Sequence, residues 1–339
     1  MKRLCLIPLL LAAAPAPQPA PSPPEIVAAA PAADWVAIAA SDLLVMDLAA
    51  DAKGRPRRVV IQLMPPPFSQ GWIGNIRTLA AAHFWDGTSV NRVQDNYVVQ
   101  WGDVESDDPK KAKVLPEALV SVSESEYLTP VIYSRTSHFD KLDPPFKLPL
   151  NVEEFGWQMD PLIGEGEGAL RIPGASGLSS GWPVGYIGKD QRKGKEFGPV
   201  ATMWPVHCYG MVGVGRGFSP DTGSGAELYT VIGHAPRHLD RNIALVGRVI
   251  QGIEHLSSLP RGTEALGFYK TAEERVPILS VRTGNEIADL PAFEYLSTES
   301  ESFATYADAR ANRRDPFFIK PAGGADICNI PVPVRRKKG

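Results

Sequence analysis

Net charge, long hydrophobic runs and cysteine are all scarce in this sequence. The formal net charge of -3 over 339 residues gives no general attraction to nucleic acid or to an anionic membrane. The apolar run at residues 4–14 is too short to span a bilayer. Three cysteines allow at most one disulfide within the chain. We therefore expect a soluble protein without affinity for nucleic acid, and 44% hydrophobic content can supply a sizeable core.

The beginning of the chain has the pattern of a secretory signal. Lys2 and Arg3 precede the apolar run, and alanines at its end offer small residues for cleavage. We predict a signal peptide at residues 1–20 and a periplasmic or otherwise exported protein. The Pro/Ala-rich residues 21–34 are expected to form an extended linker. With Cys5 removed, Cys208 and Cys328 either pair in an oxidising compartment or remain two unpaired thiols.

Several segments show the periodicity of regular secondary structure. Residues 42–48 and 58–64 are β-prone and flank a polar turn, which predicts an antiparallel pair. Residues 69–83 have apolar side chains at helical spacing, which predicts an amphipathic helix. A short helix is expected at residues 249–256 and a further strand at 277–282.

The stretch from residue 84 to 103, FWDGTSVNRVQDNYVVQWGD, has the most distinctive pattern. Its Asp-Gly pair predicts a turn, followed by adjacent strands at residues 89–93 and 97–101. Alternation in the first strand would place Val90 and Arg92 on one face. In the second strand it would set Tyr97, Val99 and Trp101 opposite Val98 and Gln100. This arrangement presents an arginine and a glutamine beside an aromatic ring, although a solvated arginine at a sheet edge would look the same.

Three other patterns suggest chemistry that their context does not support. The G-x-S-x-G at residues 177–181 has no apolar strand running into it and no helix after it, which argues against a nucleophile elbow. The glycines at residues 164–168 lack the strand and helix of a dinucleotide loop and predict a turn. His234 and His238 have metal-ligand spacing, but Pro236 between them prevents a regular helix. We expect no metal and no cofactor.

The stretch at residues 84–103 resembles the central motif of the cyclophilin family of peptidyl-prolyl isomerases. That motif reads F-[YF]-D-G-x-x-F-H-R-V-x-x-x-F-[MV]-[IV]-Q-[GA]-G-D, and it is matched here by Phe84, Asp86, Gly87, Arg92, Val93, Gln100, Gly102 and Asp103. A second family signature is similar to residues 223–249, at Gly225, Tyr229, Ile232, Pro236, His238, Leu239, Asp240, Gly247, Arg248 and Val249. Gly215 and Arg216 stand where the family has Ala-Asn.

The resemblance implies a mainly β fold, a closed eight-stranded antiparallel barrel capped by two helices. It places the cyclophilin-like domain at residues 35–290. Residues 104–206, here called the insertion, are much longer than the family's connection and are expected to be ordered. Residues 291–339, here called the C-terminal extension, should contain a helix to about residue 313 that begins with a capping box of Thr298 and Glu301.

The resemblance also implies a function, the isomerisation of X-Pro bonds in exported polypeptides. In that scheme the catalytic residues are Arg92, which donates to the twisted amide, and Gln100, which binds substrate backbone. The implied substrate-binding residues are Tyr97, Val98, Gly215, Arg216, Glu227, Tyr229, His238 and Leu239. No nucleic acid or membrane partner is implied, and the oligomeric state is left open.

Five departures from the family pattern affect this expectation: Asn91, Tyr97, Glu227, Tyr229 and Ile243. The tyrosine hydroxyls should make the proline pocket more polar than in the family. Glu227 should pair with Arg92 or Arg216 and temper the cation. The alternative function is therefore a peptide-binding or chaperone module with little isomerase activity, since a fold alone does not fix an activity.

Overall fold

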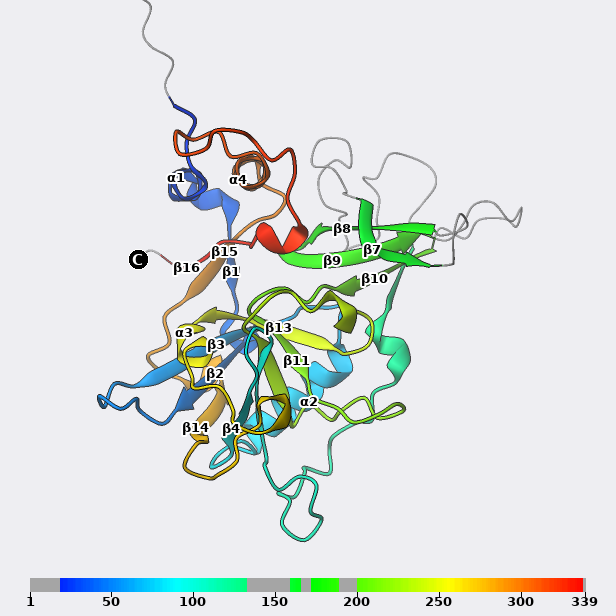
Figure 1. Ribbon diagram of the computed structural model, residues 1–339, viewed down its shortest axis with the longest axis vertical. Coiled ribbons are helices and arrows are strands. Elements are labelled where there is room, and N and C mark those ends of the chain that lie inside the picture. Colours follow the sequence, from blue (N-terminus) through cyan, green and yellow to red (C-terminus); the bar gives the residue numbers. More distant parts are fainter. Residues whose placement is uncertain (1–18, 133–158, 166–171, 189–199, 338–339) are drawn as a thin grey trace, which may run out of the picture.

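A closed antiparallel barrel forms the body of the molecule (Figure 1). The computed structural model describes residues 19–132, 159–165, 172–188 and 200–337. Around the barrel the strand order is β11-β12-β5-β4-β14-β2-β3-β13. The strands are β2 (Leu43–Leu48), β3 (Arg57–Leu63), β4 (Ser89–Val93), β5 (Val98–Gly102), β11 (Met211–Val214), β12 (Leu228–Val231), β13 (Leu245–Gln251) and β14 (Val276–Thr283). The eight strands confirm the predicted barrel.

The first two barrel strands follow directly from the sequence pattern. β2 and β3 pair from Leu43↔Gln62 to Leu48↔Arg57, as the two β-prone segments predict. Asp47 accepts two hydrogen bonds from Arg58 across this pair, at 2.8 and 2.9 Å. Because β2 also pairs with β14 from the far end of the domain, the barrel closes between its first and last strands.

Two helices accompany the barrel, and one of them is shorter than predicted. α2 (Gln70–Ala81) buries an apolar stripe that includes Trp72, Ile76 and Leu79. α3 covers only Glu254–Ser257. The helix expected at residues 249–256 was therefore wrong in its first part, because Val249 pairs with Ile61 and continues β13 as a strand. Pairing on both sides of a strand overrides a helical spacing of apolar residues.

The described part of the insertion forms a second sheet of five strands with the order β6-β10-β9-β8-β7. Its strands are β6 (Thr129–Ile132), β7 (Met159–Glu165), β8 (Ile172–Ser179), β9 (Trp182–Gly188) and β10 (Val200–Pro205). The sheet lies above one end of the barrel (Figure 1). The G-x-S-x-G motif ends β8 and turns into β9, and the expected turn at residues 164–168 lies partly outside the described residues.

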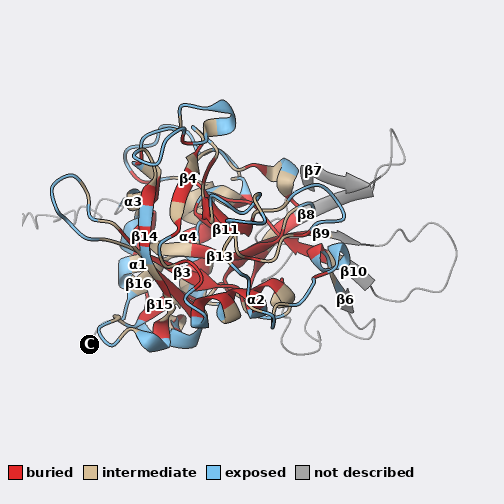
Figure 2. Ribbon diagram, turned by 90° about the horizontal axis from the view of Figure 1, so that it is seen from below, coloured by how far each residue is buried: buried red, intermediate tan, exposed pale blue. Residues whose placement is uncertain are grey.

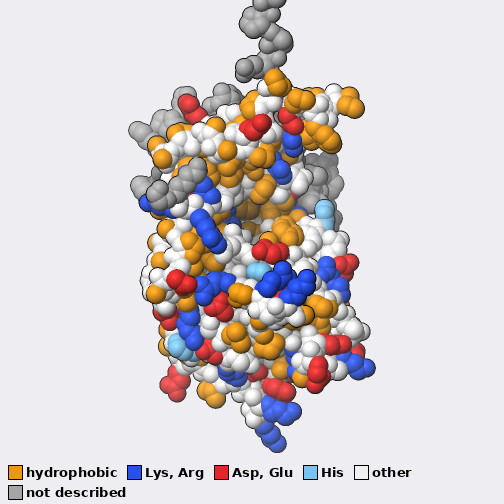
Figure 3. Space-filling view, turned by 90° about the vertical axis from the view of Figure 1, so that its left-hand side faces the viewer, with side chains coloured by type: hydrophobic (Ala, Val, Ile, Leu, Met, Phe, Trp, Pro, Cys, Tyr) orange, Lys and Arg blue, Asp and Glu red, His pale blue; other side chains and the backbone are white. Residues whose placement is uncertain are grey.

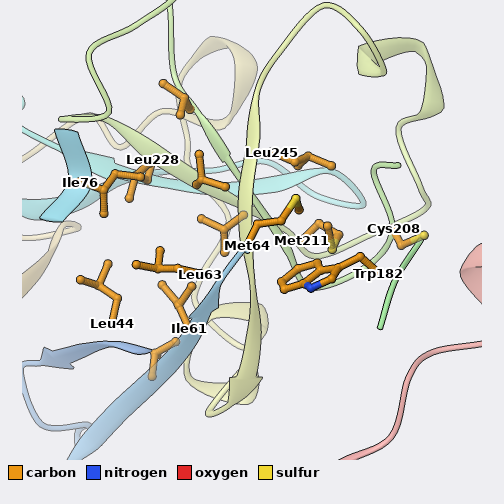
Figure 4. Packing of buried hydrophobic residues seen from close by; sticks show 14 of the residues in the cluster. Leu44, Ile61, Leu63, Met64, Ile76, Trp182, Cys208, Met211, Leu228 and Leu245 are labelled. Atoms are coloured by element: carbon orange, nitrogen blue, oxygen red, sulfur yellow. The ribbon is translucent and has the colours of Figure 1, made fainter. Parts of the chain in front are cut away.

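The insertion sheet and the barrel share one hydrophobic core. Trp182 of β9 packs beside Met211 and Met64 of the barrel (Figure 4). Arg248 of β13 crosses the same junction, donating to the Gly181 carbonyl at 2.7 Å and to the Gln62 side chain at 2.8 and 3.0 Å. Burial lowers the pKa of this arginine to about 10. Buried residues continue from the barrel into the adjoining segments (Figure 2).

A third sheet joins the two ends of the described chain. Its order is β1-β15-β16, with β1 (Trp35–Ile38), β15 (Phe293–Leu296) and β16 (Val334–Arg336). Beside it, α1 (Pro23–Ala29) packs on α4 (Glu301–Ala311). The extended linker expected at residues 21–34 was wrong, because part of this segment forms α1. The capping box expected at Thr298 was also wrong, because α4 is capped by Ser300, whose hydroxyl accepts a hydrogen bond from the Phe303 N–H.

A disulfide between Cys208 and Cys328 ties the C-terminal extension to the segment before β11. Of the two alternatives for these cysteines, the structure therefore has the bonded one. Cys328 lies in the short 3₁₀ helix η9 (Ile327–Asn329).

Short 3₁₀ helices connect several of the other elements. Among the described residues they are η1 (Ala32–Asp34), η2 (Ala40–Asp42), η3 (Glu124–Tyr127), η6 (Arg237–Leu239), η7 (Ala265–Gly267), η8 (Gly284–Glu286) and η9.

The surface differs between the two halves of the molecule. In Figure 3, hydrophobic side chains gather over the upper half, whereas charged side chains of both signs are more frequent over the barrel. No helix in the described ranges is long and apolar enough to cross a membrane. Most of the predicted signal peptide lies outside the described residues.

Candidate active site

A β-bulge in β4 decides which way Arg92 points. Val90 pairs with Trp101 and Arg92 pairs with Gln100, so Asn91 is an extra residue in the strand. The bulge lets Val90 and Val93 both enter the core, fully buried, while Arg92 faces outward. The expectation that Val90 and Arg92 share a face was therefore wrong, because one extra residue shifts the alternation.

The outward face of three neighbouring strands forms the candidate site. On β12 and the residue before it, Glu227, Tyr229 and Val231 occupy alternate positions of one face. Across to β5, Tyr229 pairs with Gln100 and Val231 pairs with Val98. Gln100 in turn pairs with Arg92 on β4, so the strand register brings these side chains into one row of the sheet.

Arg92 is held in place by three hydrogen bonds. Its Nε donates to the Leu266 carbonyl at 2.8 Å, its Nη1 to Gln100 Oε1 at 2.8 Å, and its Nη2 to the Gln94 side chain. The Phe268 ring centre lies 5.3 Å from the guanidinium carbon. Partial burial lowers the pKa of Arg92, but an arginine stays protonated at neutral pH.

The bonds to Arg92 leave part of the guanidinium available. A guanidinium has five N–H donors, and the three bonds above use one each on Nε, Nη1 and Nη2. Two N–H groups therefore remain for an incoming acceptor, as far as the described residues show. The side chain is a preorganised donor on the rim of the outward face.

A buried apolar cluster adjoins the arginine. Val98, Tyr229 and Val231 form a buried cluster, with Tyr97 and Ile243 packed against it. Tyr97 follows Asn96, whose φ is +50°, and it precedes β5. It is therefore outside the alternation of that strand, and the expectation that it lies opposite Val98 was wrong.

His238, predicted at the rim of the site, and Leu239, predicted in its lining, occupy different positions relative to the apolar cluster. The His238 imidazole stacks on the Tyr97 ring with 6.2 Å between ring centres, as a rim residue would. Leu239 lies half-buried in η6 and is not part of the apolar cluster. Val231 and Phe268 belong to the site but were missed, since neither stands at a motif position considered in the sequence.

The hydroxyl of Tyr229 points away from the pocket into a buried polar chain. It lies 2.7 Å from His207 Nε2, and His207 Nδ1 lies 2.8 Å from the Asp240 carboxylate. The carboxylate can only accept, so Nδ1 carries a hydrogen and Nε2 accepts from the hydroxyl in the neutral imidazole. Burial raises the pKa of Tyr229 well above its ordinary value, which keeps the hydroxyl protonated.

For Tyr229, these hydrogen bonds correct the expectation that its hydroxyl makes the site more polar. The Tyr229 ring lies in the apolar cluster, while its oxygen is hydrogen-bonded to His207. Gly213 makes room for it, because a Cβ at that position would come within 2.3 Å of the Tyr229 oxygen. Arg237 extends the chain with a 2.8 Å hydrogen bond to Asp240.

Glu227 lies beside the pocket and pairs with neither predicted arginine. Its carboxylate accepts a hydrogen bond from Gln100 Nε2, so Gln100 bridges it to Arg92. Arg216 instead donates to the carbonyls of Asn242 and Gly217. Partial burial raises the pKa of Glu227 above its ordinary value.

The sequence matches the model of a known protein family over most of the barrel, including the candidate site. The model of the family described as cyclophilin type peptidyl-prolyl cis-trans isomerase/CLD matches residues 72–283, more than half of the chain. The chain therefore belongs to the cyclophilin-type peptidyl-prolyl cis-trans isomerase family, and the barrel is a cyclophilin-like fold. No curated protein matches the sequence.

Among solved structures, the chain is similar to the cyclophilin AquaCyp293 from Hirschia baltica. The TM-score is 0.57 at 16% identity, covering 90% of this chain and 95% of the other. A cyclophilin type peptidyl-prolyl cis-trans isomerase from Cryptosporidium parvum, solved in the presence of the dipeptide Ala-Pro, is also similar. Its TM-score is 0.34 at 11% identity, covering 70% of this chain and 98% of that one.

Proposed function

We propose that the protein catalyses cis-trans isomerisation of X-Pro peptide bonds in exported polypeptides. The observation that carries the proposal is the combination of an apolar cluster on the outward face of the barrel with a fixed cation at its edge. The pocket cluster of Val98, Tyr229 and Val231 can hold a proline ring. Arg92, beside it, keeps two N–H donors for the substrate.

The physical requirement is a lower barrier to rotation about one amide bond. Resonance gives that rotation a barrier of about 20 kcal/mol, and the uncatalysed exchange takes tens of seconds or more. Twisting the amide localises a lone pair on the proline nitrogen, which a nearby donor stabilises more than it stabilises the planar ground state. Arg92 would supply that donor, and Gln100, held between Arg92 and Glu227, would bind substrate backbone.

The remaining site residues would shape the groove around the proline. Tyr97 and His238 would form the pocket rim through their stacked rings. Gly215 would keep the approach open, since it carries no side chain, and Arg216 would border it. Leu239 would support the pocket wall from η6. The mechanism needs no covalent intermediate.

The test is proline isomerisation by the mature protein, measured by NMR exchange on an Ala-Pro-containing peptide. Arg92→Ala should reduce kcat/KM at least about tenfold, since one preorganised donor typically contributes a hundredfold or more. Arg77→Ala is the matched control, because Arg77 lies on α2 and forms an ion pair with Asp42 away from the site. Equal rates for Arg92→Ala and the parent, both above background, would refute the assignment.

A second candidate is a peptide-binding module with little catalysis. It is favoured by the three internal hydrogen bonds of Arg92, which already engage much of the guanidinium. Peptide binding without any acceleration of exchange in the parent protein would select this candidate.

We also propose an oxidising compartment for the protein. The Cys208–Cys328 disulfide supports it, because such bonds persist mainly outside the cytosol. Intact-mass measurement on protein from its native host should show loss of the N-terminal signal residues and two cysteines resistant to alkylation. Full-length chain with both thiols free would contradict export.

A further inference from the structure

Glu227 brings a carboxylate into the candidate site. It occupies the same face of β12 as Tyr229 and Val231, whose side chains form the pocket. Its side chain is half-buried, and Gln100 holds one carboxylate oxygen. Among the described residues, no lysine or arginine lies within ion-pair distance of the other oxygen. A partly desolvated carboxylate without a cation is costly, so such a group has a reason to bind one.

Glycines on both sides fix the position of the carboxylate. A Cβ at Gly215 would come within 2.9 Å of Glu227 Cγ, and one at Gly102 within 3.3 Å of the same atom. The Gly215 N–H also donates to the Glu227 carbonyl at 2.8 Å. The side chain therefore lies in a slot between two strand backbones. A charge held in this way loses little conformational freedom when it binds a partner.

The surrounding charges leave this end of the site open to a cation. Burial raises the pKa of Glu227, and the negative charge of Asp107 raises it further, while the Gln100 hydrogen bond and the positive charge of Arg92 lower it. Arg92 is separated from Glu227 by Gln100 and is engaged by Gln94 and Leu266. Arg216 donates hydrogen bonds to the Asn242 and Gly217 carbonyls instead.

We propose that Glu227 makes the site select proline peptides with a lysine or arginine close to the proline. The inference rests on the proposed function for the identity of the peptide site. The proline ring would occupy the pocket, and the cationic side chain would reach the Glu227 oxygen that Gln100 leaves free. A role confined to orienting Gln100 would not require a charge, because a neutral glutamine can also accept the Gln100 amide hydrogen.

Matched peptides of the form Ala-X-Pro-Phe test the selection, with X as lysine, norleucine or glutamate. Norleucine has the alkyl length of lysine without its charge. A second series moves the same three residues to the position two before the proline, and a third to the position after it. Both Kd and the NMR exchange rate are measured for each peptide at low salt.

In one of the three series we expect lysine to be preferred over norleucine by up to about fivefold, the upper end for a partly exposed ion pair. Glutamate should be the weakest of the three. Glu227→Gln should bring the lysine-to-norleucine ratio to about one, and salt should reduce the ratio in the parent. Glu117→Gln, which removes an exposed carboxylate from the insertion, is the control and should keep the ratio.

The two measurements separate this inference from the proposed function. Lysine selection in Kd without faster exchange would support the role of Glu227 and refute isomerase activity. Faster exchange with equal lysine and norleucine values in all three series would overturn the role of Glu227 alone. A ratio that survives Glu227→Gln would also overturn it, and a lack of binding by every peptide would overturn both.

Discussion

The hydrogen bond between Tyr229 and His207 gives a sharp test of how the pocket is built. Tyr229→Phe removes the hydroxyl and leaves the ring in place. Tyr229 is 4% exposed and His207 0%, so no solvent replaces the lost partner. A buried nitrogen left without a hydrogen bond costs about 1–3 kcal/mol of unfolding free energy. For a chain of 339 residues, a loss of about 2 kcal/mol lowers Tm by about 3 °C.

Urea unfolding and thermal melting at pH 7 measure this change. Tyr97→Phe is the matched control, because the described residues offer its hydroxyl no hydrogen bond and its ring is in the same pocket. It should change the free energy of unfolding by no more than about 0.5 kcal/mol. Tyr229→Phe with parent-like stability would refute the buried polar chain, as would an equal loss in both variants. Retained peptide affinity in Tyr229→Phe would show that the ring face, and not the hydroxyl, meets the substrate.

Three further predictions concern stability. Arg282 lowers the pKa of Asp86 through two hydrogen bonds, so this pair stabilises the fold above the ordinary carboxylate pKa. Asp86→Asn should therefore be less stable than the parent at pH 7 by up to about 1 kcal/mol, and urea titrations at several pH values should show the gap closing as pH falls through the lowered pKa. Reducing the bond between Cys208 and Cys328, which are 120 residues apart, should lower the free energy of unfolding by about 2–5 kcal/mol, and an unchanged Tm with reductant would contradict this. Arg248→Met should cost about 2–4 kcal/mol and speed proteolysis within the insertion, because two buried acceptors lose their donor; cleavage at the parental rate would show that this arginine does not hold the insertion sheet.

Local sequence patterns predicted the barrel strands well, because β-prone residue types and the alternation of side chains between two faces are properties of each strand by itself. The bulge in β4 was not predictable in the same way. Asn91 is an ordinary strand residue by composition, and only the partner register shows that it is an extra one. The orientation of Arg92 therefore depends on pairing with β5, which a single strand does not encode.

The N-terminal helix shows a different limit of local reasoning. Proline excludes a helix interior but is tolerated in the first turn, where Pro23 and Pro24 stand. The Glu25 carboxylate accepts from the Ser22 N–H at 2.7 Å, which stabilises the start of α1. Packing against α4 supplies the remaining stabilisation, and that partner lies at the other end of the chain.

Within the candidate site, motif matching singled out residues that the structure brings together but did not give their hydrogen-bond partners. Arg92, Gln100 and Glu227 were singled out together, and the structure joins them in one hydrogen-bonded row. The direction of the Tyr229 hydroxyl was missed because His207 belongs to neither motif. A histidine close before a glycine-rich strand was the only available signal, and it does not specify a partner.

The strand order also determines when parts of the molecule can form during synthesis. β1 precedes all strands of the barrel in the sequence, whereas both strands that complete its sheet, β15 and β16, follow the barrel. Likewise, the barrel can close only after β14 has been made and has paired with β2. The nascent chain must therefore carry unpaired strand edges while the barrel strands between these partners are made. A protein proposed to assist the folding of others would itself depend on protection of those edges until β14, β15 and β16 have been made.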